Sequence, residues 1–461
     1  MLKRLLTGLL AAVTMAAAVI CCLPAPKAGA LTFSPTCTVH SESAILYNMD
    51  VDSVVYEKNA DKKELPAALV QIMTAVLVLE ECDNIASETL TAAGDMYSDF
   101  KKYEFPADLR YAKIREGDTL TVEDLLYAMM LTSSCEASTM LAVRFGSGSQ
   151  SNFVEKMNKK AAELGMTNTR FINATGLYSA RQVSTARDMM TLLKYAMSIQ
   201  QFERIACAST YTPPTAEELG RTKDWTWEHS NLMAFKDNSY TTTGAKGIKT
   251  GTLDEGGRSI AVKASRDGNN YLFVAMNAPI TDEKGKNQFY HLEDAKNVLE
   301  WAFQHLGFKE IQPQDTELGQ VSVINGDGSD YVLLKPEKGF SCMWCDAYDP
   351  NTVQRIPSWA NEINAPVNAG DVMGKLTLKY SGETLAELNV VAASSVRRSF
   401  WRYNLAEIPG FFKSKYLHAT WIVALILTVL YIAGCIFFRV RYNKIKKARK
   451  EAGLHGTVKK Q

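Results

Sequence analysis

The sequence lacks a surplus of charge of either sign, although it is 461 residues long. Its 51 lysine and arginine residues face 50 aspartate and glutamate residues, which leaves a formal net charge of +1. A protein that holds nucleic acid over a large surface normally carries a basic excess. The composition therefore argues against a nucleic-acid-binding protein. Internal repeats and low-complexity segments are also missing, which excludes a repeat architecture.

Cysteine is scarce in the part of the chain that we expect to be secreted. Its cysteines there are Cys37, Cys82, Cys135, Cys207, Cys342 and Cys345. This number is too small for a disulfide scaffold in a chain of this length. Cys342 and Cys345 form a C-x-x-C pair, but no second pair accompanies them, so a zinc site is unsupported and no cofactor is expected. A local disulfide or two idle thiols are the remaining interpretations.

The N-terminus has the three parts of a secretory signal peptide. Lys3 and Arg4 supply positive charge, residues 5–23 form an apolar run, and Ala28-Gly29-Ala30 is an A-x-A cleavage site. An uncleaved anchor is the alternative, which the proline and small residues after the run disfavour. We therefore expect residues 1–30 to be a signal peptide.

A second apolar run lies near the C-terminus. Residues 419–438 carry no charge, and 20 residues suffice to cross a bilayer as a helix. The basic tail that follows, 439–461, is expected in the cytoplasm because positive residues stay inside. The sequence thus predicts a single-pass membrane protein whose large part is extracellular. Residues 396–418 mix aromatic and basic residues, which indicates an amphipathic segment at the membrane surface.

The pattern between these segments predicts an α/β (α+β) domain followed by a small β-rich domain. Residues 44–60 alternate around a turn and indicate a hairpin, and residues 244–278 indicate further strands. Helical patterns lie between them, one opened by a capping box at Thr121 and Asp124. Strands at both ends with helices between them imply a sheet backed by helices. Short alternating stretches from 312 to 395 indicate the β-rich domain.

Several dispersed motifs then stand in a specific order. They are "ELPAALVQIMTAVLVLEEC" from Glu64, "GDTLTVEDLLYAMMLTSS" from Gly117, "FINATGL" from Phe171 and "GIKTGT" from Gly247. With them, the chain from about residue 41 to 393 resembles the serine-type D-alanyl-D-alanine carboxypeptidases. These are low-molecular-mass penicillin-binding proteins of peptidase family S11, related to β-lactamases. The resemblance implies a transpeptidase-like domain over residues 31–305, the β-rich domain over 312–395, and a place in the bacterial cell membrane.

The resemblance also implies a site, and two of its catalytic positions are substituted. Sites of this family combine S-x-x-K, S-x-N and K-T-G motifs. The nucleophile position falls on Ala68 and the base position on Gln71. Alanine has no nucleophilic atom, and glutamine is no useful base near pH 7. Of the second motif, Ser133 keeps the relay serine, while Cys135 replaces the substrate-holding asparagine.

The third motif is intact. Lys249, Thr250 and Gly251 form the K-T-G sequence, and Lys249 and Thr250 correspond to residues that face the substrate carboxylate. Backbone N–H groups of Ala68 and Thr252 are expected to form an oxyanion hole, because that feature needs no side chain. Substrate binding without covalent chemistry would be compatible with this set.

Two functions from different classes follow from these residues. One is a non-hydrolytic cell-wall protein. It binds peptidoglycan stem peptides ending in D-Ala-D-Ala, or a cell-wall protein partner, through the cleft that holds the substrate in enzymes of this family. The other is a D-Ala-D-Ala carboxypeptidase with new chemistry, based on Cys135 or on Ser133. A thiol near Lys249 would react as a thiolate if its pKa were lowered. A buried, inert cysteine is the more common case.

Overall fold

The structure is a computed structural model and describes residues 31–451. The predicted signal peptide and the last ten residues of the tail lie outside the described residues. The chain divides into two compact units. The first runs to Ile311 and also contains Ser341–Gln354 and Leu378–Ala386, and the second contains Gln312–Phe340, Arg355–Thr377 and the chain from Glu387 onwards. The short alternating stretches that predict the β-rich domain begin at residue 312, where the two units divide.

The first unit is built on a five-stranded antiparallel sheet with strand order β2-β1-β9-β8-β7. These strands are β1 (Ser43–Asn48), β2 (Ser53–Lys58), β7 (Ala245–Leu253), β8 (Gly257–Arg266) and β9 (Asn269–Ala278). β1 and β2 form the predicted hairpin. β1 then pairs with β9, with Ser43 opposite Met276. The predicted sheet made from sequence-distant strands is confirmed.

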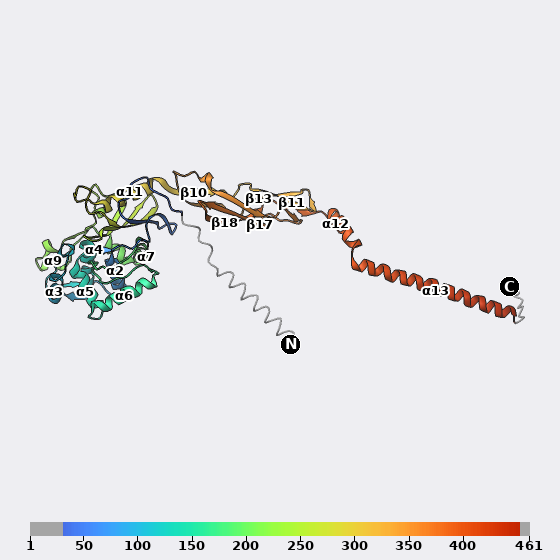
Figure 1. Ribbon diagram of the computed structural model, residues 1–461, viewed down its shortest axis with the longest axis horizontal. Helices are drawn as coiled ribbons and strands as arrows, with labels where there is room; N and C mark the ends of the chain where they lie inside the picture. Colours follow the sequence, from blue (N-terminus) through green and yellow to red (C-terminus); the bar gives the residue numbers. More distant parts are fainter. Residues whose placement is uncertain (1–30, 452–461) are drawn as a thin grey trace. The chain divides into compact units, whose positions relative to one another are not determined.

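Helices cover this sheet on two sides (Figure 1). The helices of the first unit are α2 (Val70–Glu81), α3 (Asp95–Lys101), α4 (Val122–Thr132), α5 (Cys135–Phe145), α6 (Gln150–Glu163), α7 (Ala186–Met197), α8 (Gln200–Ala206), α9 (Thr215–Glu218), α10 (Thr222–Trp225) and α11 (Tyr290–His305). α11 lies on one side of the sheet, and α2, α4, α5 and α7 lie on the other. α2 is buried at every position from Val70 to Val78, as a helix apolar on all sides requires.

Short elements connect these parts. They are the 3-10 helices η1 (Ala67–Leu69), η2 (Pro106–Asp108) and η3 (Leu232–Ala234), and the paired strands β3 (Thr89–Thr91) with β4 (Thr119–Thr121) and β5 (Thr210–Tyr211) with β6 (Trp227–Glu228). η1 directly precedes α2, so the start of the central helix is a tight turn. That turn contains Ala68.

The turn between α4 and α5 places two polar residues beside the central helix. α4 begins at the predicted capping box, where Thr121 accepts a hydrogen bond from Asp124 N–H and Asp124 accepts one from Thr121 N–H. It ends at Ser133, which has left-handed backbone angles (φ 62°, ψ 28°). Ser134 then caps α5 by accepting from Ala137 N–H. The helical region that begins at the capping box is therefore interrupted between Thr132 and Cys135.

The second unit is rich in β-structure, as predicted. Its six-stranded sheet has the order β15-β17-β18-β13-β11-β16. The strands are β11 (Gly319–Ile324), β13 (Tyr331–Pro336), β15 (Gln354–Trp359), β16 (Glu362–Asn364), β17 (Val372–Tyr380) and β18 (Glu383–Ala392). β12 (Gly326–Asp327) pairs separately with β19 (Arg397–Arg398). The pair of β10 (Leu306–Gln312) with β14 (Phe340–Cys345) belongs almost wholly to the first unit. Cys342 and Cys345 are free thiols in the structure, so the disulfide considered for them is not formed.

Two helices end the described chain, α12 (Phe400–Phe412) and α13 (Lys415–Glu451). On α12, the apolar side chains of Phe400, Trp401 and Leu405 are exposed. α13 contains the predicted span 419–438, and its most apolar window has a mean hydropathy of 2.6. Its apolar side chains are exposed as well. By length and composition, α13 is able to cross a membrane.

We expect Thr121→Ala to lower the free energy of unfolding by about 1 kcal/mol, because the side chain satisfies an N–H group at the start of α4. The matched control is Thr89→Ala, an exposed threonine opposite Thr121 in the β3–β4 pair, which should change stability by less than about 0.5 kcal/mol. Thermal unfolding of the full-length chain in detergent measures both. An equal loss of unfolding free energy in the two variants would contradict the capping role of Thr121.

Candidate functional site

One cavity in the first unit collects most of the positions that the sequence predicts to form the site. Its volume is about 280 Å³. The wall contains Ala68 from η1, Ser133 and Cys135 from the α4–α5 turn, and Thr250, Gly251 and Thr252 from β7. Gln71 and Lys249 are fully buried and bond to Ser133 from behind this wall. The predicted residues therefore form two layers, a cavity wall and a polar layer behind it.

The backbone at Ala68 is held in place by two glycines. A Cβ atom on Gly176 would lie 2.3 Å from the carbonyl oxygen of Ala67, and Gly176 has a φ of +82°. A Cβ atom on Gly251 would lie 2.7 Å from the backbone nitrogen of Ala68. Only glycine permits such close approach of two chain segments. The main chain at the nucleophile position thus keeps a tightly specified geometry although the side chain is a methyl group.

Gln71 is fixed by three acceptors. Its Nε2 donates to the carbonyl oxygens of Ser133 (3.2 Å) and Thr175 (3.0 Å) and to Ser138 Oγ (3.1 Å). A primary amide has only two N–H groups, so one of them is shared, whereas an ammonium group has three. Gln71 Oε1 is buried and has no partner among the described residues. The surroundings of Gln71 therefore match a lysine ammonium better than they match the amide present.

Ser133 and Lys249 form a buried pair. Lys249 Nζ donates a hydrogen bond to Ser133 Oγ. Burial lowers the pKa of Lys249 to about 7, because the charged amine loses its water. A large fraction of this lysine is therefore neutral at physiological pH, which makes its nitrogen able to accept a proton. A hydroxyl beside a neutral amine is the arrangement of a nucleophile and its base.

Cys135 does not have the properties that thiolate chemistry needs. Its side chain is buried, and burial raises the pKa of the thiol to about 12. Lys249 opposes this effect only weakly. The lowered pKa considered for Cys135 from the sequence is therefore wrong. The thiol is protonated at neutral pH, which weakens the hydrolase hypothesis based on cysteine.

Lys249 also departs from its expected position facing a ligand. Its exposed fraction is zero, and the residues of the cavity wall do not include it. Thr250 does line the cavity, and its Oγ1 lies 2.9 Å from Ser230 Oγ. The amine of Lys249 is thus bound to Ser133 behind the wall, whereas Thr250 reaches the cavity. That Thr250 faces a substrate carboxylate stays a prediction.

Two arginines, Arg110 and Arg258, line the cavity, and sequence reasoning missed both. Arg258 of β8 stands opposite Thr252 in the β7–β8 register. It is 9% exposed, and its guanidinium lies 4.4 Å from the ring centre of Phe289. The sequence did contain a signal for Arg258. The glycine-rich turn after the K-T-G motif predicts a hairpin, and in a hairpin Arg258 pairs with Thr252. His291 of α11, another lining residue, had no such signal.

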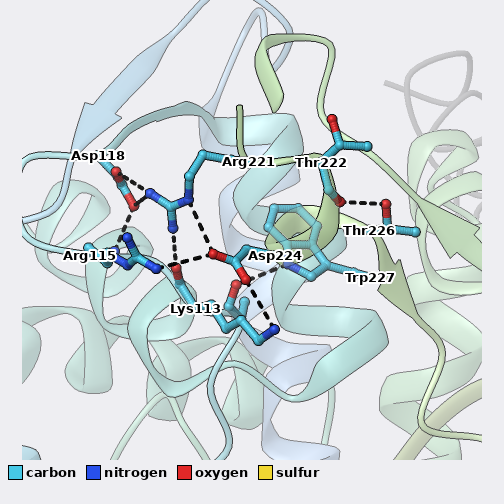
Figure 2. A network of polar contacts seen from close by, with 9 residues as sticks. Lys113, Arg115, Asp118, Arg221, Thr222, Asp224, Thr226 and Trp227 are labelled. Carbon is cyan, nitrogen blue, oxygen red and sulfur yellow. Dashed lines mark hydrogen bonds and ion pairs between the residues drawn. The ribbon is translucent and has the colours of Figure 1, made fainter. Parts of the chain in front are cut away.

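A network of side chains holds the segment that follows two residues of the cavity wall (Figure 2). Asp108 and Arg110 line the cavity, and the chain after them reaches this network at Lys113. Arg221 Nη2 donates to the Lys113 carbonyl oxygen (2.6 Å), and Arg221 Nη1 contacts both oxygens of Asp118 (2.9 Å each). Asp224 contacts the amine of Lys113 at 3.2 Å. Side chains of α10 and of Arg221 just before it therefore fix the segment from Lys113 to Asp118, which follows these wall residues.

Comparison with known proteins agrees with this architecture. The profile of the peptidase S11 family, D-alanyl-D-alanine carboxypeptidase, matches residues 30–280. That of the penicillin-binding protein 5 C-terminal domain matches residues 308–398. The D-alanyl-D-alanine carboxypeptidase DacF of Bacillus subtilis is 27% identical over 361 residues, which cover 78% of this chain and 86% of the relative.

Solved structures show the same fold. Penicillin-binding protein 5 from Haemophilus influenzae superposes with a TM-score of 0.54 at 20% identity, covering 79% of this chain and all of that one. The carboxypeptidase DacD from Francisella tularensis gives a TM-score of 0.55 at 18% identity, covering 80% of this chain and 96% of that one. The protein has the two-part architecture of the penicillin-binding proteins. It belongs to the D-alanyl-D-alanine carboxypeptidase family.

We expect Lys249→Met to change the pH dependence of stability. Lys249 has a pKa of about 7 in the folded chain against 10.5 for the ordinary side chain, so unfolding takes up a proton between these values. The buried lysine therefore destabilises the wild type at and below pH 7, and this effect fades as the pH rises. The stability of Lys249→Met relative to wild type should fall steadily from pH 7 to pH 10.

Thermal unfolding of the full-length chain at several pH values measures this difference. The variant also loses the hydrogen bond to Ser133, which lowers its stability by about 1 kcal/mol at every pH. The test is therefore how the stability difference changes with pH, and not whether it is positive or negative. Lys246→Met, which removes a half-exposed lysine from the same strand, is the control for a generic loss of charge. A difference that does not vary with pH would show that Lys249 titrates normally.

Proposed function

We propose that this member of the family is a non-hydrolytic cell-wall protein. In this proposal the cavity binds peptidoglycan stem peptides ending in D-Ala-D-Ala, or a cell-wall protein partner, without cleaving them. The observation that carries it is the pair of substitutions at the start of α2. Ala68 presents a methyl group to the cavity, and Gln71 places a neutral amide where a base is needed.

The chemistry of acyl transfer explains why these two positions matter together. The nucleophile and its base act as a unit, and loss of either removes several powers of ten in rate. The frame around them is kept, since Gly176 and Gly251 still approach the main chain at 67–68. A cavity with an intact backbone can bind a peptide without attacking it. Binding with loss of cleavage is therefore the function that these residues support best.

A second candidate function has one observation in its favour. Ser133 lines the cavity, and its hydroxyl is bonded to Lys249, whose pKa of about 7 suits a general base. In this candidate Ser133 attacks the peptide carbonyl and Lys249 takes its proton. The protein would then be a hydrolase with a relocated nucleophile.

We also propose the membrane topology. α13 would cross the bacterial cell membrane once, with the first unit and the β-rich part of the second unit outside and the basic tail inside. Protease treatment of intact protoplasts should then degrade the first unit and leave a fragment that contains α13 and the tail. An antibody against residues 452–461 detects this fragment, and lysed cells serve as the control. Protection of the first unit in intact cells would contradict the topology.

Labelled penicillin tests the proposed function directly, because it traps the attacking serine of this family as an ester. The full-length protein in membranes should take up no label. Ala68→Ser should label poorly, since its hydroxyl would lack a base. Ala68→Ser with Gln71→Lys should recover part of the labelling, because the three acceptors around position 71 suit an ammonium group. Adding Cys135→Asn should increase it further.

The controls separate the two candidate functions. Label on the unmodified chain that disappears in Ser133→Ala would favour the relocated nucleophile and reject the non-hydrolytic proposal. The wild type could instead release D-alanine from a stem peptide while Ser133→Ala does not. That result would also favour the relocated nucleophile and reject the non-hydrolytic proposal. An unlabelled triple variant with an unchanged melting temperature would mean that the cavity no longer has the shape that acylation needs.

A further inference from the structure

Asp108 is a buried carboxylate that has no cation in contact with it. It is 8% exposed, it lines the cavity, and it is the last residue of η2. Within residues 31–451 it forms no ion pair, and it accepts a hydrogen bond from the backbone N–H of Asp254. Burial raises the pKa of Asp108, and the carboxylates of Asp254 and Glu255 add to this effect. A buried carboxylate in these surroundings is stabilised by a cation that joins it.

Arg110 is the cation nearest to Asp108 along the chain, but its guanidinium bonds elsewhere. Nη1 of Arg110 donates to the carbonyl oxygens of Ala107 and Leu109. The Arg110 side chain is exposed and lowers the pKa of Asp108 only in part. Arg110 therefore favours the ionised form of Asp108 without occupying the carboxylate oxygens.

The wall segment that carries this carboxylate is held on both sides of η2. After η2, the carbonyl oxygen of Arg110 accepts a hydrogen bond from Cys135 N–H (2.9 Å). Before η2, Tyr178 N–H donates to the hydroxyl of Tyr103 (2.7 Å), and the ring of Phe105 meets the ring of Tyr178 edge-on with 5.1 Å between centres. The carboxylate is thus positioned before a ligand arrives, which reduces the entropy cost of binding.

Apolar side chains line the cavity beside this carboxylate. Leu253 and Leu177 both belong to the wall. Leu253 directly precedes Asp254, whose N–H bonds to Asp108, so the main chain at Leu253 adjoins the carboxylate. An apolar wall that ends at an acidic group suits a chain of CH₂ groups with an ammonium group at its end. Ala68 lines the same cavity, so one ligand is able to reach both places.

We infer that Asp108 binds the ammonium group of an amine-bearing side chain on the cavity's ligand. The inference rests on the proposed function, in which the ligand is a stem peptide ending in D-Ala-D-Ala. The amine then belongs to a diamino acid that precedes the two D-alanines. The site would select stem peptides whose side-chain amine is free. It would discriminate against those in which a second peptide has acylated the amine, because an amide carries no charge.

The test is a cycle of two peptides and two proteins. Nα-acetyl-Lys-D-Ala-D-Ala and the same peptide acetylated on its side-chain amine are titrated against the full-length chain in detergent by calorimetry. The wild type should bind the free amine roughly tenfold more tightly than the acetylated one. In Asp108→Asn this preference should vanish through weaker binding of the free amine, with binding of the acetylated peptide unchanged. Such coupling identifies a direct contact between the carboxylate and the amine.

Matched variants separate a contact from a general effect of charge. Asp254→Asn removes an exposed acid that is absent from the cavity wall, and it should keep most of the preference. Arg110→Gln removes the nearby positive charge and should increase the preference. Equal losses in Asp254→Asn and Asp108→Asn would overturn the inference, because they would indicate a diffuse field. If Asp108→Asn fails to fold, an unchanged preference in Arg110→Gln would reject the site.

A small amine separates this inference from the proposed function. When butylammonium chloride replaces sodium chloride at equal ionic strength, the change in melting temperature should be more positive in the wild type than in Asp108→Asn. Peptide binding without a preference for the free amine would overturn the amine site and leave the proposed function standing. No peptide binding at all would overturn the proposed function, and the comparison of the two salts would then decide the amine site alone. Equal changes in both proteins would reject it.

Discussion

Gln71, Ser133 and Lys249 are joined by hydrogen bonds inside the first unit, where the fully buried side chains of Gln71 and Lys249 cannot replace a lost partner with bulk water. An unpaired polar group in such a place costs about 1–3 kcal/mol. The α4–α5 turn, the start of α2 and strand β7 are therefore tied to one another through these side chains. The cavity wall depends on this polar layer, because each of its members holds a segment that carries wall residues.

The polar layer also explains how a chain of this family can lose its nucleophile and base and keep its fold. Ala68 contributes main chain to the cavity, and Gly176 and Gly251 approach the main chain at 67–68 and the Cβ atom of Ala67, not the side chain of Ala68. Gln71 still supplies N–H groups to three acceptors, so a neutral amide holds the same carbonyl groups that an ammonium would hold. A shorter apolar residue at position 71 would leave these acceptors unpaired. Loss of catalysis and retention of structure are thus physically compatible here.

Much of the fold was predictable because its signals are local. The capping box at Thr121, the break at Ser133 and the hairpin of β1 and β2 each depend on a few neighbouring residues. The gathering of positions 68, 133, 135 and 250–252 followed from the family resemblance. Burial could not be predicted in this way, because it depends on segments far apart in the chain. The high pKa of Cys135 and the low pKa of Lys249 both result from such burial.

Two of the cations near the cavity show why residue type alone does not assign a role. Lys249 belongs to the motif, yet its amine is enclosed, bonded to a hydroxyl and largely neutral near pH 7. Arg258 belongs to no motif, yet its guanidinium lines the cavity, packs on Phe289 and lacks a counter-ion among the described residues. A guanidinium holds its proton under conditions in which a buried amine loses it. The side chain that keeps its charge and reaches the cavity is the one that can attract an anion, and here that side chain is the arginine.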